Sequence, residues 1–276
     1  MAMNIPDYRI TWVHGIGQFT PDYSVPWRTA FNSYLNFPDS DYIEVLWATV
    51  FNMLVANKAK LQLTLQEAVT EDVVRKTLAT VLLARATALP DAPSGEWSGM
   101  IGEEAVDEAL LPDWLPGWLP NLEDDIDEFT QYLLNAGIRS AVKAKVKEKL
   151  IPLAGSGDDI SIIAHSWGTV VAYDSLLDLE VEEPDFQLTN LFTLGSPLWL
   201  VKPFLVNSSG RKPRNTADWV NIHTLGDLIG GPLRPAFQVD HDFAVPNFGG
   251  PDAHNSYFVD GNVAVQRDIV AATILG

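Results

Sequence analysis

The chain has 276 residues, of which 47% are hydrophobic, and it contains no cysteine. Disulfide bonds, thiolate metal sites and cysteine nucleophiles are therefore excluded. The 18 basic and 36 acidic side chains give a net charge of −18, which argues against a nucleic-acid backbone as a partner. A chain of this length can bury one sizeable core, and we expect a single domain over residues 1–276.

The N-terminal residues lack the basic and apolar segments of a secretory signal peptide. No apolar run reaches the roughly 18 residues that a membrane-spanning helix needs. We therefore expect a soluble protein without stable membrane insertion, cytoplasmic unless a presequence has been removed. The sequence leaves the oligomeric state open.

Five short apolar or β-branched runs, bounded by polar residues, Gly or Pro, predict buried parallel strands. They are Tyr8–Val13, Tyr42–Val50, Ile160–Ala164, Leu191–Leu194 and Trp219–Leu225. Helical patterns separate most of them, and this alternation predicts an α/β fold whose mainly parallel sheet is covered by helices. Sites in such folds lie at the carboxyl ends of the strands.

Residues 51–150 interrupt this alternation, because they read as helical or irregular and contain no convincing strand. We predict a largely helical insertion. Within it, Leu110–Pro120 carries Trp114 and Trp118 between prolines spaced four apart, which excludes a continuous helix. One hypothesis makes this segment a lid or pocket wall in which Trp114 and Trp118 bind substrate, and ordinary packing onto the core is the alternative.

Three segments have the apolar spacing of helices. They are Asn121–Asn135, Ile138–Leu150, which Gly137 separates from the first, and Thr169–Leu179. The third matters most, because it follows the predicted strand Ile160–Ala164 after only a few residues.

The junction between that strand and that helix reads Ala164-His165-Ser166-Trp167-Gly168. A small residue, any residue, Ser, any residue and Gly between a strand and a helix form a nucleophile elbow, in which a sharp turn exposes the serine hydroxyl. Ala164 replaces the glycine usual at the first position. The free N–H groups of the helix favour negative charge beside Ser166. The alternative is that Ser166 merely caps the helix.

A serine nucleophile needs a base and an acid that orients the base. His254, on a loop ahead of a predicted final helix, is the candidate base, and His241 is its competitor. Asp227 stands at a strand end before a glycine-rich turn and is the candidate acid, with Asp240 and Asp242 as competitors.

An oxyanion hole also has candidates. The loop His14-Gly15-Ile16-Gly17 follows the first strand, where its backbone N–H groups can face an oxyanion, and Trp167 supplies the N–H that follows the serine. The histidines and acids show no metal-ligand spacing, so we expect neither a metal nor a cofactor.

Together these residues resemble the α/β-hydrolases of the bacterial lipase and carboxylesterase kind. The matching stretches cover most of the chain outside residues 51–150 and are His14-Gly15, Ala164-His165-Ser166-Trp167-Gly168, Leu194-Gly195-Ser196-Pro197, Gly226-Asp227 and Ala253-His254. The order Ser166, Asp227, His254 is that of the family. The resemblance implies the α/β-hydrolase fold, a triad of these three residues, and an oxyanion hole at Ile16 and Trp167.

The resemblance further implies that small-molecule or lipid esters are hydrolysed through an acyl-enzyme. Thioesterases, amidases and acyltransferases would use the same residues. An acyl-ligand-binding protein that has kept the fold without turnover is the alternative from another class.

Overall fold

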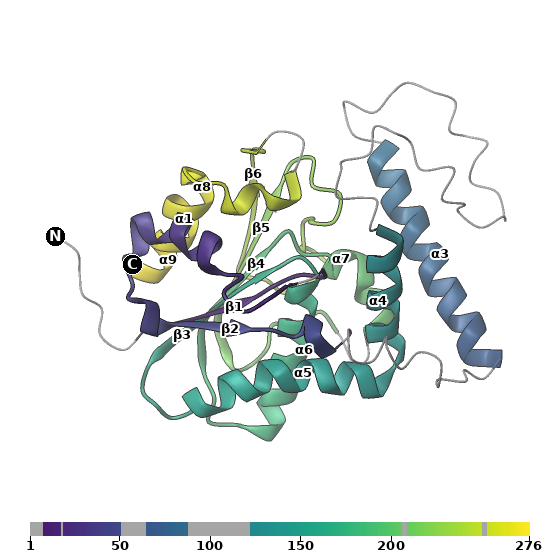
Figure 1. The fold of residues 1–276 in the computed structure, drawn as a ribbon, viewed down its shortest axis with the longest axis horizontal. Helices are drawn as coiled ribbons and strands as arrows, with labels where there is room; N and C mark the ends of the chain where they lie inside the picture. The colour runs from purple at the N-terminus through teal and green to yellow at the C-terminus, as the bar shows by residue number, and fades with distance from the viewer. Residues whose placement is uncertain (1–7, 18, 51–64, 88–121, 206–208, 250–252) are drawn as a thin grey trace.

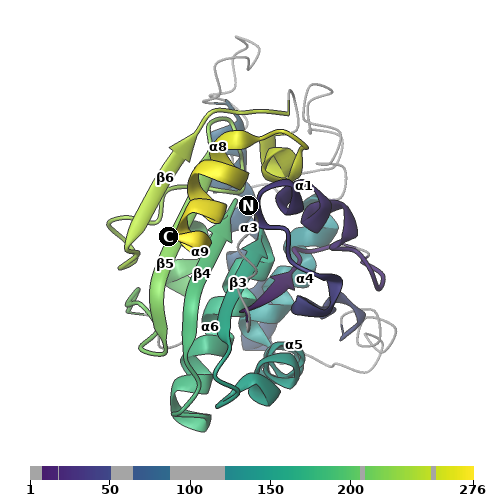
Figure 2. The same cartoon turned by 90° about the vertical axis from the view of Figure 1, so that its left-hand side faces the viewer.

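The computed structural model describes residues 8–17, 19–50, 65–87, 122–205, 209–249 and 253–276. A six-stranded sheet with the order β2-β1-β3-β4-β5-β6 runs through these ranges, and every neighbouring pair is parallel. Helices cover both faces of the sheet (Figures 1 and 2). The predicted α/β class with a parallel sheet is confirmed.

The strands are β1 (Tyr8–Val13), β2 (Tyr42–Val45), β3 (Asp159–His165), β4 (Leu188–Leu194), β5 (Thr216–Thr224) and β6 (His241–Val245). Each of the five predicted strands is present. The predicted run Tyr42–Val50 is too long, however, because β2 ends at Val45 and residues 48–50 form a helical turn. Residues 47, 48 and 50 are apolar because they are buried in the core, not because they belong to a strand.

β6 was not predicted from the sequence. It pairs only with β5 among the described strands, and His241, Phe243 and Ala244 are exposed on it. An edge strand with so little burial lacks the continuous apolar run that identifies the central strands.

The register brings the carboxyl ends of the strands to one edge of the sheet. Val13 of β1 lies beside Ala164 of β3, and His165 lies beside Leu194 of β4. Leu194 in turn pairs with Ile222 of β5. The loops that leave β1, β3, β4 and β5 therefore start close together, as expected for a site in a parallel sheet.

The helices are α1 (Val25–Leu35), α3 (Leu65–Thr87), α4 (Leu122–Leu134), α5 (Ala136–Leu150), α6 (Trp167–Glu182), α7 (Leu198–Val201), α8 (Val263–Val265) and α9 (Ala272–Leu275). The π-helical segment Gln266–Ala271 joins α8 to α9, and 3₁₀ turns occupy Asp39–Asp41, Ile151–Leu153, Lys202–Phe204 and Ala253–Phe258. None of the helices in the described ranges is both long and apolar enough to cross a membrane.

Two apolar layers hold the helices to the sheet. On one face, α1 and the C-terminal helical segment pack in a cluster that includes Phe31, Ile163 and Val270. On the other face, the larger cluster joins α3, α4, α5 and α6 to the sheet. α3 packs against α4 and also contacts α7, which directly follows β4, so α3 and α4 lie toward the carboxyl ends of the strands (Figure 1).

The described parts of residues 51–150 consist of α3, α4 and α5, and they contain no strand. The break between α4 and α5 lies at Asn135 and not, as predicted, at Gly137. The Asn135 side chain accepts hydrogen bonds from the N–H groups of Gly137 and Ile138, at 3.0 and 3.1 Å. This N-cap starts a new helix, and Gly137 belongs to its first turn.

Candidate active site

Ser166 occupies a sharp turn between β3 and α6. Its φ of 54° and ψ of −134° lie in a region that non-glycine residues rarely adopt, which costs on the order of 1–3 kcal/mol. Ser166 stands at the N-cap of α6, but its side chain makes no capping hydrogen bond. Its backbone N–H donates to the carbonyl of Leu194, at 3.0 Å, so the turn is fixed to β4 and the hydroxyl has no part in capping.

The small residues around Ser166 are required by close backbone approaches. A Cβ atom at Gly168 would overlap the carbonyl oxygens of His14 and Val13. A Cβ at Gly15 would lie 2.7 Å from the Cβ and 3.2 Å from the Oγ of Ser166. Ala164 is fully buried and its single methyl group is accommodated. The loop after β1 therefore lies directly against the serine.

His14 fixes that loop. A carbonyl oxygen only accepts, so the Nδ1–H of His14 donates to the carbonyl of Gly15 at 2.6 Å, and Nε2 accepts from the N–H of Trp47 at 3.2 Å. Burial lowers the pKa of His14 to about 4, so the ring is neutral at pH 7. The indole Nε1 of Trp47 also donates to the carbonyl of His14, at 2.8 Å.

The two predicted oxyanion donors are chain neighbours of Gly15, which contacts Ser166, and of Ser166 itself. Ile16 follows Gly15 in the loop that contacts Ser166, and the next residue, Gly17, has a φ of 130°, which other residues rarely adopt. Trp167 is the first residue of α6, where a backbone N–H has no acceptor within its own helix. Both N–H groups therefore belong to backbone that lies next to the Ser166 side chain.

Asp227 and His254 are hydrogen-bonded to each other, and both are buried. The Nδ1 of His254 lies 2.9 Å from Oδ1 of Asp227. The same oxygen accepts the N–H groups of Ile229 and Gly230, at 2.9 and 2.8 Å. The phenol of Tyr257 donates to the other oxygen, Oδ2, at 2.7 Å.

These contacts keep Asp227 ionised. Burial by itself raises the pKa of the carboxyl, but the charge and hydrogen bond of His254, followed by the hydrogen bonds of Gly230 and Tyr257, bring the pKa well below its usual range. A carboxylate that accepts several hydrogen bonds is stabilised in its charged form. It holds the Nδ1–H of His254 and leaves Nε2 for another partner.

His254 lies beside the serine turn. Its ring centroid is 4.6 Å from that of His165, the residue before Ser166, and its backbone carbonyl accepts from Nε2 of His165 at 2.8 Å. Burial and then the neighbouring His254 lower the pKa of His165 to about 3, so this ring is neutral and donates through Nε2–H. His165 thus joins the loop of His254 to the strand that ends at the serine.

The Leu194–Pro197 loop separates these groups with little bulk. Gly195 has a φ of 58°, and a Cβ there would lie 3.0 Å from Oδ2 of Asp227 and 3.2 Å from Cε1 of His254. Ser196 bonds through its hydroxyl to Thr169 on α6, at 2.7 Å. This close packing of the segment after β4 against Asp227, His254 and α6 explains the sequence motif.

The competing residues lie elsewhere. His241 begins β6 at the amino end of that strand, is largely exposed, and approaches Asp218 at 3.8 Å. Asp240 pairs with Lys212, at 2.8 Å. Asp242 accepts from Asn221 and from the backbone of Leu233 and Arg234. The structure thus brings Asp227 and His254 together and leaves these three away from the serine turn.

Residues that the sequence did not single out also belong to the site. Besides Tyr257, the ring of Phe129 on α4 stacks on the indole of Trp167, with ring centroids 3.6 Å apart. α4 is held there by a buried cluster in which Asp174 of α6 accepts from Tyr132 and Arg139. Nothing in the local sequence marks these contacts, because each joins segments far apart in the chain.

Trp114 and Trp118, and with them the segment Leu110–Pro120, lie outside the described residues. Within the described ranges, no group of three or more His, Cys, Asp and Glu side chains is placed to hold a metal ion.

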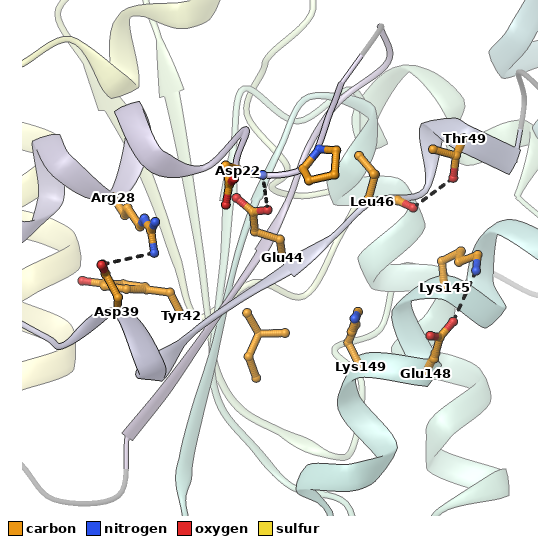
Figure 3. A pocket seen from close by; sticks show the side chains of 12 residues that line it. Asp22, Arg28, Asp39, Tyr42, Glu44, Leu46, Thr49, Lys145, Glu148 and Lys149 are labelled. Carbon is orange, nitrogen blue, oxygen red and sulfur yellow. Dashed lines mark hydrogen bonds and ion pairs between the residues drawn. The ribbon is translucent and has the colours of Figure 1, made fainter.

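A pocket of about 680 Å³ lies at the β2 edge of the sheet (Figure 3). Its walls come from α1, β2 and α5, and they carry the ion pairs Arg28–Asp39 and Lys145–Glu148, at 3.2 and 3.3 Å. None of the residues around Ser166 lines it. This pocket is therefore distinct from the candidate active site.

Comparison with known proteins adds no family assignment. No protein-family model matches the chain, and no curated protein matches it.

Proposed function

We propose that this protein is a serine hydrolase of the α/β-hydrolase type that cleaves carboxylic esters. Ser166 is the nucleophile, His254 the base, and Asp227 the acid that orients His254. The observation that carries the proposal is the hydrogen-bonded pair Asp227–His254 beside a serine held at positive φ between a strand and a helix. Strained backbone of this kind is concentrated at functional sites.

In the proposed reaction, Oγ of Ser166 attacks the ester carbonyl while Nε2 of His254 takes the hydroxyl proton. The tetrahedral oxyanion is bound by the N–H groups of Ile16 and Trp167. His254 then protonates the leaving alcohol, and an acyl-enzyme on Ser166 remains. Water, deprotonated by the same histidine, attacks the acyl-enzyme and releases the acid.

Asp227 contributes by remaining a carboxylate. Its lowered pKa means that it does not take a proton from His254 at neutral pH. It stabilises the imidazolium that forms when Ser166 is deprotonated. His14 and His165, whose pKa values are lowered by burial, support the loops and take no part in proton transfer.

The test is intact mass after exposure to a small fluorophosphonate, with peptide mapping of the adduct and Ser166→Ala as the control. We expect one adduct per chain, on Ser166, and none on the variant. Folded protein that acquires no adduct would contradict the proposal and favour a binding protein that retains the fold. If labelling succeeds, matched esters, thioesters and amides of one acyl group then determine which bond is cleaved fastest.

A further inference from the structure

Helix α3 reaches the loop of Asp227 through one side chain. Arg85, in the last turn of α3, donates through Nη2 to the carbonyl of Gly230. Its guanidinium lies over the indole of Trp199, 4.8 Å from the ring centroid, which is a cation–π geometry. Because 145 residues separate Arg85 from Gly230, this contact joins a helix of the predicted insertion to the acid of the candidate site.

Gly230 belongs to the turn that holds Asp227. Its N–H, together with that of Ile229, donates to Oδ1 of Asp227, the oxygen that also bonds His254. A Cβ at Gly230 would overlap Oδ2 of Asp227 and approach the Cα of Gly195 at 2.5 Å. The turn therefore packs tightly between Asp227 and the loop of Gly195 that follows β4. A displacement of Gly230 would displace the Asp227 carboxylate.

The outer side of the turn is held by a stacked pair. Nε1 of Trp199 donates to the carbonyl of Ile229, at 2.9 Å, and Arg85, stacked on the same indole, holds the next carbonyl, that of Gly230. Two successive carbonyls thus point toward α3 and α7, while the N–H groups of the same two residues point toward Asp227. This arrangement fixes the orientation of the turn from both sides.

Arg85 also places a positive charge near Asp227. It makes no ion pair with any carboxylate in the described ranges. Burial lowers the pKa of its guanidinium, and the nearby Asp227 carboxylate is the largest opposing influence. An arginine that is half-buried and directed at a backbone carbonyl, close to a buried carboxylate, is suited to holding that carboxylate in place.

We propose that Arg85 is a positioning residue of the active site: acting through Gly230, it fixes the turn that orients Asp227 toward His254. This inference rests on the proposed function. On this inference, α3 contributes to the orientation of Asp227. A helix that only covered the sheet would not affect that orientation.

The experiment compares wild type with Arg85→Met, Arg85→Lys and Lys76→Met. The readouts are the rate of Ser166 acylation by a small fluorophosphonate, kcat and KM for a small ester, and the far-downfield proton resonance of the Asp227–His254 hydrogen bond. Lys76 pairs with Asp72 on the exposed side of α3, at 2.9 Å, so its variant removes the same charge from the same helix without touching the turn. Trp199→Phe keeps an aromatic ring under Arg85 and removes only the bond to Ile229.

We expect Arg85→Met to acylate at least tenfold more slowly, to lose kcat with little change in KM, and to weaken or lose the hydrogen-bond resonance. Arg85→Lys should recover part of the rate, and Lys76→Met should match wild type. Trp199→Phe should acylate more slowly than wild type, with the same loss of kcat and of the hydrogen-bond resonance. This variant tests the inference if Arg85→Met does not fold.

Two results would overturn the inference while leaving the proposed function intact. One is Arg85→Met acylating at the wild-type rate. The other is a slow variant that retains the hydrogen-bond resonance unchanged, which would place the effect of Arg85 elsewhere than on the acid. Failure of wild type itself to acylate would instead reject the proposed function.

Discussion

The phenol of Tyr257 donates a 2.7 Å hydrogen bond to the carboxylate oxygen of Asp227 that His254 does not use. The same phenol oxygen accepts the N–H of Thr224, at 2.9 Å, so Tyr257 connects the acid to the end of β5. Asp227 thereby has hydrogen-bond donors on both oxygens while remaining almost fully buried. A buried carboxylate needs such partners, because an unpaired charge in the interior is strongly destabilising.

We expect Tyr257→Phe to lower the free energy of unfolding by about 1.5–3 kcal/mol, the range for a hydrogen bond to a charged group. kcat/KM should also fall, by roughly tenfold, because a freer carboxylate orients His254 less well. Tyr8→Phe is the matched control. Tyr8 is also buried, but its hydroxyl bonds Ser161 and Asn190 near the amino ends of the strands. Urea denaturation and steady-state kinetics give both quantities; equal activity losses in the two variants would refute a specific role for Tyr257.

Gly15→Ala should lower kcat about a hundredfold without unfolding the protein. The added methyl group would lie 2.7 Å from the Cβ of Ser166, so the loop that carries Ile16 must move away from the serine. A displacement of about 1 Å at a reacting group costs about a hundredfold in rate. Gly137→Ala is the control, because its methyl would meet only the Asn135 side chain, at 3.3 Å, in the first turn of α5. Kinetics on both, with circular dichroism to confirm folding, checks this prediction.

Stability should decline as the pH falls from about 6.5 toward 4. Burial lowers the folded-state pKa of His14 to about 4, whereas an unfolded histidine titrates near 6.5. Between these values the unfolded chain binds more protons, so the stabilising contribution of neutral His14 is complete above pH 6.5 and is lost on acidification. One such group contributes a slope of up to about 1.4 kcal/mol per pH unit.

His14→Gln isolates this contribution. At pH 8, the difference in free energy of unfolding between variant and wild type gives the packing cost of the replacement. Below pH 6.5, the difference in the slope of this free energy against pH gives the contribution of protonating His14. We expect a shallower slope for the variant in urea denaturation at a series of pH values. Parallel curves for the two proteins would show that His14 does not titrate in this window.

Phe129→Ala should affect catalysis as well as stability. Removing the ring that stacks on Trp167 leaves a cavity beside the proposed oxyanion N–H, and such truncations cost about 3–5 kcal/mol. Phe186→Ala is the control, because Phe186 is equally buried but precedes β4 at the opposite end of the sheet. At a temperature where both variants remain folded, we expect only Phe129→Ala to lower kcat. If Phe186→Ala lowers kcat equally, the stack on Trp167 has no special role.

Features that depend on the local pattern of apolar and small residues could be predicted from the sequence. β1, β3, β4 and β5 are found where apolar runs place them, and the Ser166 turn follows from small residues whose positions the backbone demands. The contact between Asp227 and His254 could be expected only from their order along the chain. Its geometry depends on Gly195, which leaves room for both side chains.

The remaining features could not be predicted because they depend on long-range packing. Arg85, Phe129 and Tyr257 look like ordinary helix or loop residues, and only the fold brings them to the acid and the serine turn. β6 was missed because an edge strand buries few side chains. Apolar residues after β2 suggested a longer strand, since burial in a turn and burial in a strand leave the same pattern.

The pairing of β1 with β3 has a consequence for how the chain folds. Tyr8 and Ser161, bonded across these strands, are separated by 153 residues, whereas Ser161 and Asn190, bonded across β3 and β4, are separated by only 29. Closing the longer loop costs about 1.5 kcal/mol more chain entropy than closing the shorter one. We therefore expect β3, β4 and β5 to assemble first. During synthesis from the N-terminus, β1 and β2 must wait for the second half of the chain to emerge, a period in which their apolar surfaces need protection from aggregation.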